Sequence, residues 1–214
     1  MKIETIGKVS VNLAEKALSI AVNTTSYRKG EEEIKNTTNG TLSHEGLRHL
    51  VYEAGEKIEQ KEEKEIELYE QEKLVKGTKE IVALFEEADG LWINLQGKDR
   101  KEQIEKYKAQ HPNEEVPKKV RNIEIKLGMT YEGWKETGKN RYELVGKEYV
   151  AGYMTGEEMA NITNANLHSK YDMSKVELRV LNSDGGSWIK RLLTEKAIYQ
   201  ADSYHLKEKI TTHV

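Results

Sequence analysis

The sequence predicts a mixed α/β protein with a helical amino-terminal region, and three observations support this fold class. Residues 1–78 carry apolar side chains at helical spacing. From residue 79 onward, segments with period-two alternation dominate. Three such strands follow one another, and then helices and strands alternate, which is typical of a mixed sheet flanked by helices. We therefore expect a helical region at 1–78 and a sheet-containing domain at 79–214.

The composition excludes several classes of protein. The 214 residues include 34 Lys and Arg against 37 Asp and Glu, a formal net charge of -3. The chain as a whole therefore does not attract nucleic acid, and any DNA-binding surface has to be local. No apolar run approaches the length of a membrane span, and the start lacks the core of a signal peptide. The absence of cysteine excludes disulfides and thiolate metal sites and fits a cytoplasmic location.

Three helices are expected in the amino-terminal region. The first carries an apolar stripe from Ala14 to Val22, and the second covers residues 27–35. Ser43 is a good N-cap for the third, whose apolar stripe thins after Ile58 into a run of Glu and Lys. The end of the third helix should therefore run into solvent, and the region is a candidate for binding DNA or a partner protein.

Five strands are expected in the second region, at residues 81–96, 122–131, 141–153, 176–182 and 197–202. A capping box at Thr155 opens a helix that ends before Tyr171, and a short helix is expected at 187–193. In a three-layer fold the strand after a helix often lies beside the first strand, so the fourth strand is expected there. Glu177 and Arg179 argue against this position, because a strand buried on both faces is usually apolar.

The segment between the first two strands, residues 98–119, is basic and hydrophilic and holds both prolines. It predicts a long surface excursion. Its basic residues are Lys98, Arg100, Lys101, Lys106, Lys108, Lys118, Lys119 and Arg121. They form a local cluster suited to phosphate contacts, but acidic neighbours dilute it, and a solvated loop is an equal alternative.

Two aspartates are distinctive because each closes a strand-like run and is followed by glycine. Asp89 precedes Gly90, and Asp184 precedes Gly185. A carboxylate beside a glycine that leaves room for a ligand is one way to bring separate acids to a hard cation. Two such carboxylates could hold a pair of Mg²⁺ or Mn²⁺ ions for phosphoryl transfer. An isolated Asp-Gly is also common in strand-end turns, so the paired occurrence carries the prediction.

Four motifs in the second region occur in order at compatible spacing. They are Glu87-Ala88-Asp89-Gly90, Gly128-Met129-Thr130-Tyr131-Glu132-Gly133-Trp134, Asn182-Ser183-Asp184-Gly185-Gly186-Ser187-Trp188-Ile189-Lys190 and Asp202-Ser203-Tyr204-His205-Leu206. They resemble one family of bacterial insertion-sequence transposases, long catalogued only as an uncharacterised protein family and similar to the Mutator-type transposases. The match covers residues 80–214, with weaker matches at 25–28 and 42–44. The resemblance implies a ribonuclease H-like core of the DDE type.

The resemblance also implies a function, namely DNA cleavage and strand transfer with Asp89 and Asp184 as metal-binding members of an acidic triad. Asp202 and His205 match the family's Asp/Cys-x-x-His element, where the imidazole would orient a carboxylate or serve as a structural histidine. The family's third acid lies on a helix well downstream, whereas this sequence ends at Val214. We therefore expect an internal piece of a longer protein, without the usual N-terminal portion, and a two-ion site only in the full-length protein.

Other chemistry-bearing residues have simpler interpretations. Glu208 lies one turn after His205, where the family pattern places no acid, and is expected to be a surface charge. The three tryptophans, Trp92, Trp134 and Trp188, are expected to pack on the sheet rather than to stack on bases. His44 and His49 indicate only a polar helix face, and no Cys/His zinc pattern exists.

Two classes of function remain open. In the first, the chain belongs to a DDE transposase that acts on DNA at transposon ends, as a homo-oligomer and without a membrane. In the second, it is a non-catalytic fragment that binds DNA or a partner, regulates the full transposase, or is a remnant. A nuclease of the same fold is a weaker third option. An acidic residue encoded downstream would favour the first class for the parent protein and the second for this piece.

Overall fold

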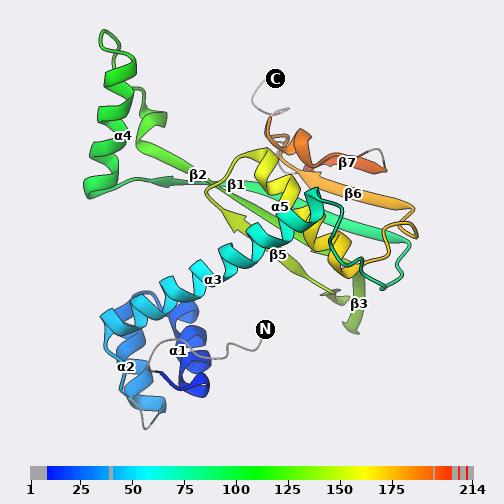
Figure 1. The fold of residues 1–214 in the computed structure, drawn as a ribbon, viewed down its shortest axis with the longest axis horizontal. Helices are drawn as coiled ribbons and strands as arrows, with labels where there is room; N and C mark the ends of the chain where they lie inside the picture. Colours follow the sequence, from blue (N-terminus) through cyan, green and yellow to red (C-terminus); the bar gives the residue numbers. More distant parts are fainter. Residues whose placement is uncertain (1–8, 39–40, 195, 204–206, 208–210, 212–214) are drawn as a thin grey trace. The chain divides into compact units, whose positions relative to one another are not determined.

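The computed structural model of the chain describes residues 9–38, 41–194, 196–203, 207 and 211 (Figure 1). It divides into two compact units, Met1–Lys64 and Glu65–Val214. The boundary falls inside helix α3 (His44–Glu70). The division predicted after residue 78 lies further along the chain, between the end of α3 and the first strand, β1 (Ala83–Asn94).

The first unit is helical, as predicted. It contains α1 (Val11–Asn23), α2 (Tyr27–Thr37) and the beginning of α3. Their buried side chains form one core, consisting of Ala14, Ala17, Ile20, Ile34, Leu47, Leu50 and Ala54. The Ser43 hydroxyl accepts the backbone N–H of Gly46 at 3.1 Å, so Ser43 caps α3 as expected. Most side chains from residue 55 to 64 are exposed, so this charged part of the helix faces solvent as expected. The end of the helix does not: Ile66 packs against a core of the second unit, and the Tyr69 ring lies 5.0 Å from that of His168, so this part of the prediction is wrong.

The second unit is built on a five-stranded mixed sheet in the order β5-β2-β1-β6-β7. Besides β1, its strands are β2 (Asn122–Tyr131), β5 (Glu148–Gly152), β6 (Leu178–Ser183) and β7 (Ala197–Ala201). The β5-β2-β1 part is antiparallel, whereas β6 runs parallel to β1 and β7 parallel to β6. The predicted fold class, a ribonuclease H-like mixed sheet with flanking helices, is confirmed. The fourth predicted strand does lie beside the first.

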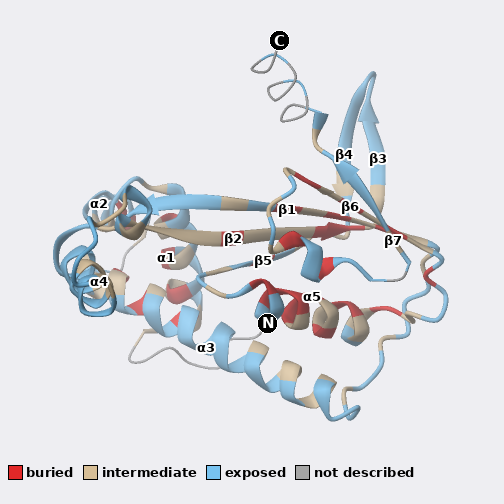
Figure 2. Cartoon of the chain, turned by 90° about the horizontal axis from the view of Figure 1, so that it is seen from above, coloured by how far each residue is buried: buried red, intermediate tan, exposed pale blue. Residues whose placement is uncertain are grey.

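Helix α5 (Gly156–Lys170) covers one face of this sheet (Figure 2). The predicted capping box starts it: the Thr155 hydroxyl accepts the N–H of Glu158 at 3.1 Å, and the Glu158 carboxylate accepts the N–H of Thr155 at 2.6 Å. The buried side chains between helix and sheet are Ala88, Val150, Met159, Ala160, Ile162, Leu181, Ile189 and Leu192. The last two belong to the short 3-10 helix η2 (Ile189–Leu192), near the predicted position.

The third predicted strand, 141–153, is wrong in one respect, because the structure has two strands there. They are β4 (Arg141–Val145) and β5, and only β5 joins the main sheet. Gly146 lies between them with a φ of 66°, a left-handed conformation that ends β4 and reorients the chain. The sequence also gave no signal for β3 (Gly133–Gly138), which pairs with β4 in a separate two-stranded sheet. β3 is short and largely exposed, and it lacks the apolar alternation that marks a half-buried strand.

The segment between β1 and β2 also differs from the prediction. It lies on the surface, as predicted, but it is not a loop throughout: it contains helix α4 (Gly97–Gln110), followed by the 3-10 helix η1 (Lys118–Arg121), and neither has a buried residue. No residue of α4 is buried, so the apolar stripe that would have indicated a helix is missing. Lys, Glu, Gln and Arg nevertheless favour helices through their intrinsic propensity. Within the described part of the chain, no helix has the length and apolarity needed to cross a bilayer.

Candidate functional site

Strand register brings the three site aspartates into one row. Ala88 of β1 pairs with Ser183 of β6, and Ser183 pairs with Ala201 of β7. Asp89, Asp184 and Asp202 each follow one of these three residues. In addition, the backbone N–H of Asp202 donates to the carbonyl of Ser183 at 2.9 Å, which holds the end of β7 against β6. The prediction that Asp89 and Asp184 occupy neighbouring strands is therefore confirmed.

Asp89 does not close its strand, as the sequence had suggested, but lies inside β1, whereas Asp184 directly follows β6. Both aspartates lie on the face of the sheet opposite α5. Side chains alternate along a strand, and Ala88 and Leu181 are buried in the core beneath α5. Asp89 follows Ala88, so its side chain lies on the other face, and it is exposed. Asp184 stands three positions after Leu181 and therefore also falls on this second face. We call it the open face, because no described helix of the second unit covers it.

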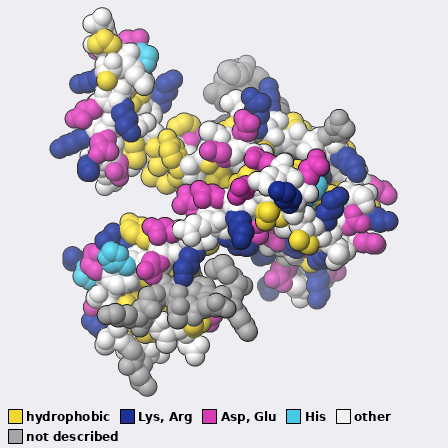
Figure 3. Space-filling view, viewed as in Figure 1, with side chains coloured by type: hydrophobic (Ala, Val, Ile, Leu, Met, Phe, Trp, Pro, Cys, Tyr) yellow, Lys and Arg dark blue, Asp and Glu magenta, His cyan; other side chains and the backbone are white. Residues whose placement is uncertain are grey.

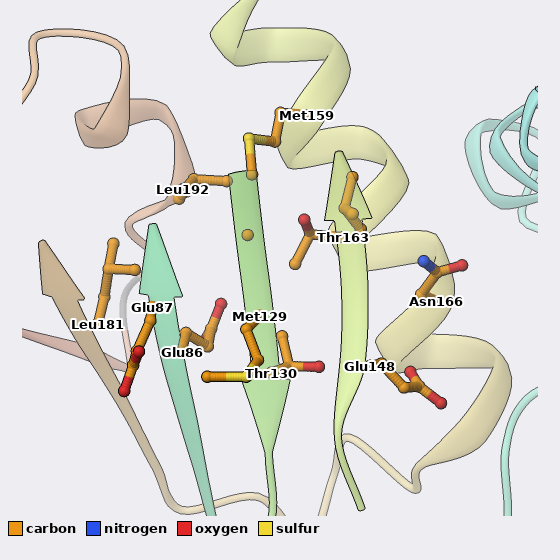
Figure 4. A pocket seen from close by; sticks show the side chains of 12 residues that line it. Glu86, Glu87, Met129, Thr130, Glu148, Met159, Thr163, Asn166, Leu181 and Leu192 are labelled. Atoms are coloured by element: carbon orange, nitrogen blue, oxygen red, sulfur yellow. The ribbon is translucent and has the colours of Figure 1, made fainter. Parts of the chain in front are cut away.

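An open pocket of about 390 Å³ lies at the aspartate row. Its lining includes Glu87, Asp89, Asn182, Asp184 and Asp202, together with apolar side chains of β2 and β5. A second cavity, between α5 and the sheet, measures only about 20 Å³ and is lined by side chains such as Met159 and Thr163 (Figure 4). A space of that size holds about one water molecule. Of these two spaces at the sheet, the open pocket is the one with room for a substrate.

The aspartate carboxylates are partly engaged by their own backbone. One oxygen of Asp89 accepts the N–H of Gly90 at 2.7 Å, and one oxygen of Asp184 accepts the N–H of Gly186 at 3.0 Å. Among the described residues, no three His, Cys, Asp or Glu side chains are grouped so that they could hold a metal ion. The donor chemistry suits Mg²⁺ or Mn²⁺, which prefer carboxylate oxygens. The residues present therefore fit part of a metal site, with the carboxylates of Asp89 and Asp184 as ligands and that of Asp202 in the same pocket.

The glycine beside Asp89 does not leave room for a ligand, and that expectation is wrong. A Cβ atom at Gly90 would lie 2.4 Å from a carboxylate oxygen of Glu124, so the Glu124 side chain already fills this space. At Gly186 a Cβ would lie 3.3 Å from the indole nitrogen of Trp188. At both glycines, the missing Cβ lets another side chain of the protein approach the backbone: Glu124 at Gly90 and Trp188 at Gly186.

Of the remaining predicted site residues, the structure describes some and not others. Asp202 lines the pocket, whereas His205 and the alternative acid Glu208 lie outside the described residues. Six basic residues of the predicted DNA-contacting cluster are exposed, three at the start of α4 and three in η1, and these two elements contact each other: Lys98, Arg100, Lys101, Lys118, Lys119 and Arg121. Acidic side chains are interspersed with basic ones over α4 (Figure 3), and Lys98 pairs with Glu102 at 3.5 Å.

Three acidic residues of this region were not singled out from the sequence. Glu87 lines the open pocket and accepts the hydroxyl of Tyr131 at 3.2 Å. Burial, and then the charge of Glu87, raise the pKa of Tyr131 to about 12. Glu87 stands two residues before Asp89 and therefore on the same face of the strand, and this spacing could have identified it from the sequence. Glu86 and Glu124 lie on the covered face, and nothing in their local sequence distinguishes them from surface charges.

The fold and pocket define a mixed α/β domain with an acidic site where parallel strand pairing ends. The chain belongs to an uncharacterised protein family, UPF0236, whose model matches residues 1–214. None of the curated proteins compared with the chain matches it.

Proposed function

We propose that this chain carries part of the catalytic core of a metal-dependent DNA transposase. One observation supports it above all: Asp89 and Asp184 each directly follow one residue of the Ala88–Ser183 pair, which joins the neighbouring parallel strands β1 and β6, and both line one pocket. A carboxylate pair of this kind suits hard divalent cations. The motifs that resemble DDE transposases contain these same two residues.

In the proposed site, Asp89 and Asp184 hold the cations and Asp202 supports them from β7. Bound Mg²⁺ or Mn²⁺ would activate a water or a 3′-hydroxyl and stabilise the leaving oxygen. The chain itself orients the carboxylates. The backbone N–H groups of Gly90 and Gly186 each fix one carboxylate oxygen, so the side chains enter the site with few rotamers left to lose.

DNA is the proposed partner, and the proposed location is the cytoplasm. Because the chain has a net charge of -3, attraction to phosphates has to come from a local surface. The exposed basic residues around the start of α4 and η1 supply one, at the end of the β1–β2 ribbon remote from the β3 side of the sheet (Figure 1). Assembly as a homo-oligomer on two DNA ends belongs to the same proposal.

Metal binding is the first test. We expect weak Mn²⁺ binding by water-proton relaxation, because each missing charged ligand lowers affinity for a hard cation. Asp89→Ala and Asp184→Ala should each abolish it, while Asp99→Ala, an exposed acid on α4, should not. Tight binding, or binding that survives both site substitutions, would argue against the site.

DNA cleavage is the second test. We expect the purified 214-residue chain to leave supercoiled plasmid intact in Mn²⁺, because the described residues bring no third metal-binding side chain to the pair. The measurement is the fraction of nicked plasmid over time. Nicking that Asp184→Ala removes would show that the site is complete, with Asp202 or Glu208 as the third acid to examine.

A non-catalytic DNA- or partner-binding role is the second candidate. The exposed end of β1 and helix α4 favour it, because Leu91, Trp92 and Ile93 are exposed and no residue of α4 is buried. This alternative predicts DNA binding that needs Lys118, Lys119 and Arg121 but is unchanged in Asp89→Ala. The catalytic proposal predicts that Mn²⁺ strengthens DNA binding and that Asp89→Ala removes this increase.

A further inference from the structure

A carboxylate on the covered face connects the segments that carry Asp89 and Asp184, although it does not line the pocket. Glu124 lies on β2, and its side chain passes over Gly90, directly after Asp89. One carboxylate oxygen accepts the indole N–H of Trp188 at 3.1 Å. The other accepts the ammonium of Lys126, also at 3.1 Å. We call these three side chains the Glu124 network.

The network also reaches the second aspartate. Trp188 lies at the end of the segment 184–188, which Asp184 begins. Its indole nitrogen would lie 3.3 Å from a Cβ at Gly186, in the middle of that segment. The N–H of Gly186 in turn donates to the Asp184 carboxylate at 3.0 Å. A continuous line of contacts therefore runs from Gly90, beside Asp89, through Glu124 and Trp188 to the turn that carries Asp184.

The Lys126 ammonium and the Glu124 carboxylate of the network neutralise each other. The Lys126 side chain is only 9% exposed, and its ammonium lies 5.1 Å from the centre of the Trp188 ring. A buried ammonium needs a counter-charge, and Glu124 provides it. A cation over an indole face adds further attraction. Glu124 is therefore held by two donors and cannot rotate away without leaving both unsatisfied.

We propose that Glu124 is a positioning residue, which fixes the Asp184–Trp188 turn against β1 and so sets the relative placement of Asp89 and Asp184. The inference rests on the proposed function for its consequence, metal binding, but not for the contacts themselves. It assigns a role to Gly90 and Gly186, since each is small so that one side chain of the network can approach.

Two readouts test this role. Glu124→Gln keeps the shape but offers only one acceptor oxygen to Trp188 and Lys126. We expect faster hydrogen exchange at the amides of Gly185 and Gly186, and about tenfold weaker Mn²⁺ binding, the usual consequence of losing a residue that orients a metal ligand. Trp188→Phe, which keeps an aromatic ring without its N–H, should give the same pair of effects. Glu143→Gln, an exposed acid on β4, is the control.

A steric test does not depend on charge. Gly90→Ala places a methyl group where the Glu124 carboxylate lies, so it should weaken Mn²⁺ binding about as much as Glu124→Gln. Once the carboxylate is removed in Glu124→Ala, the same methyl group has room. Adding Gly90→Ala to Glu124→Ala should then cause little further loss, a non-additivity expected of residues in contact.

The outcomes separate the two proposals. Unchanged amide exchange and unchanged Mn²⁺ affinity in Glu124→Gln and Trp188→Phe, with both proteins folded by tryptophan fluorescence, would overturn the positioning role. Additive losses in the double variant would do so as well. If the unmodified chain binds no Mn²⁺, the metal site fails, and the exchange of Gly185 and Gly186 alone then decides whether Glu124 holds the turn.

Discussion

Glu86 and Asp89 lie on the same strand but face opposite sides of the sheet, and their surroundings differ accordingly. Glu86 is 4% exposed beneath α5 and receives two hydrogen bonds from Arg179, at 2.5 and 2.8 Å. The remaining Arg179 nitrogen donates to Asn164 and Thr194, each at 3.3 Å. Asp89 is exposed, and the hydrogen bond that fixes it comes from the next residue of its own backbone.

This difference separates a structural carboxylate from a candidate ligand. Glu86 and Arg179 satisfy each other completely on the covered face, where a charge without a partner would be costly. The open face instead gathers carboxylates in one pocket, and the described residues that line this pocket include no Lys or Arg. Arg179 had argued against a central position for β6. It is compatible with that position because Glu86, on the neighbouring strand β1, pairs with it.

The largest effect should come from breaking the covered pair. Glu86→Ala leaves the Arg179 guanidinium buried without its counter-charge, which typically costs about 3–5 kcal/mol. Asp89→Ala, on the same strand, should change stability by no more than about 0.5 kcal/mol, as for most exposed positions. Urea unfolding followed by tryptophan fluorescence measures both, because all three tryptophans belong to the second unit. Equal losses of unfolding free energy in Glu86→Ala and Asp89→Ala would contradict the claim that the covered face holds a structural carboxylate and the open face does not.

Exposed apolar side chains on the open face lead to a second prediction. Tyr149, Ile198, Leu91 and Ile93 are 64%, 58%, 51% and 42% exposed, and strand register places them on the face of Asp89. Apolar surface of this kind promotes association, so we expect the sedimentation coefficient to rise with chain concentration.

Substitutions on that face should reduce the association. Leu91→Lys combined with Ile93→Lys should shift the chain toward monomer while changing its stability by less than about 1 kcal/mol. Val22→Lys, at an even more exposed apolar position of the first unit, is the control and should leave association unchanged. Sedimentation velocity distinguishes these outcomes, and a chain that stays monomeric at all concentrations would contradict the prediction.

Local patterns predicted most of the scaffold. The alternation of residues 122–131, the capping box at Thr155 and the cap at Ser43 all correspond to observed elements. The neighbouring strands of Asp89 and Asp184 followed from element order. In contrast, α4 and β3 were missed because neither buries an apolar side chain, and burial is what gives a sequence its period.

The contacts of the site could not be read from the sequence, because they join distant segments. Glu124 lies 64 positions from Trp188, and Glu86 lies 93 positions from Arg179. An acidic residue in a strand gives no local sign of which face it occupies or of which cation it meets. The same limitation explains why Gly90 was expected to leave room for a ligand, when a side chain of the next strand fills that space.

The smallest effect is expected at Glu132, a structural carboxylate that directly follows β2. One of its oxygens accepts the Tyr171 hydroxyl at 2.8 Å and lies 2.5 Å from the Lys79 ammonium. Burial tends to raise the pKa of the Glu132 carboxyl, but the hydrogen bonds from Lys79 and Tyr171 outweigh it and hold the pKa below its ordinary value. The charged form is therefore bound more favourably in the folded state than in the unfolded chain.

A lowered folded-state pKa gives a definite sign to the pH dependence. The stabilisation should be fully present above the unfolded-state pKa, near 4.5, and should be lost as the pH falls through the folded-state pKa. Glu132→Gln should remove this part of the acid destabilisation, and Lys79→Gln should reduce it. The measurement is urea unfolding by tryptophan fluorescence from pH 6 down to about 3. A slope that is unchanged in Glu132→Gln would mean that Glu132 keeps its ordinary pKa, so that its ion pair, unlike that of Glu86, adds nothing to the fold.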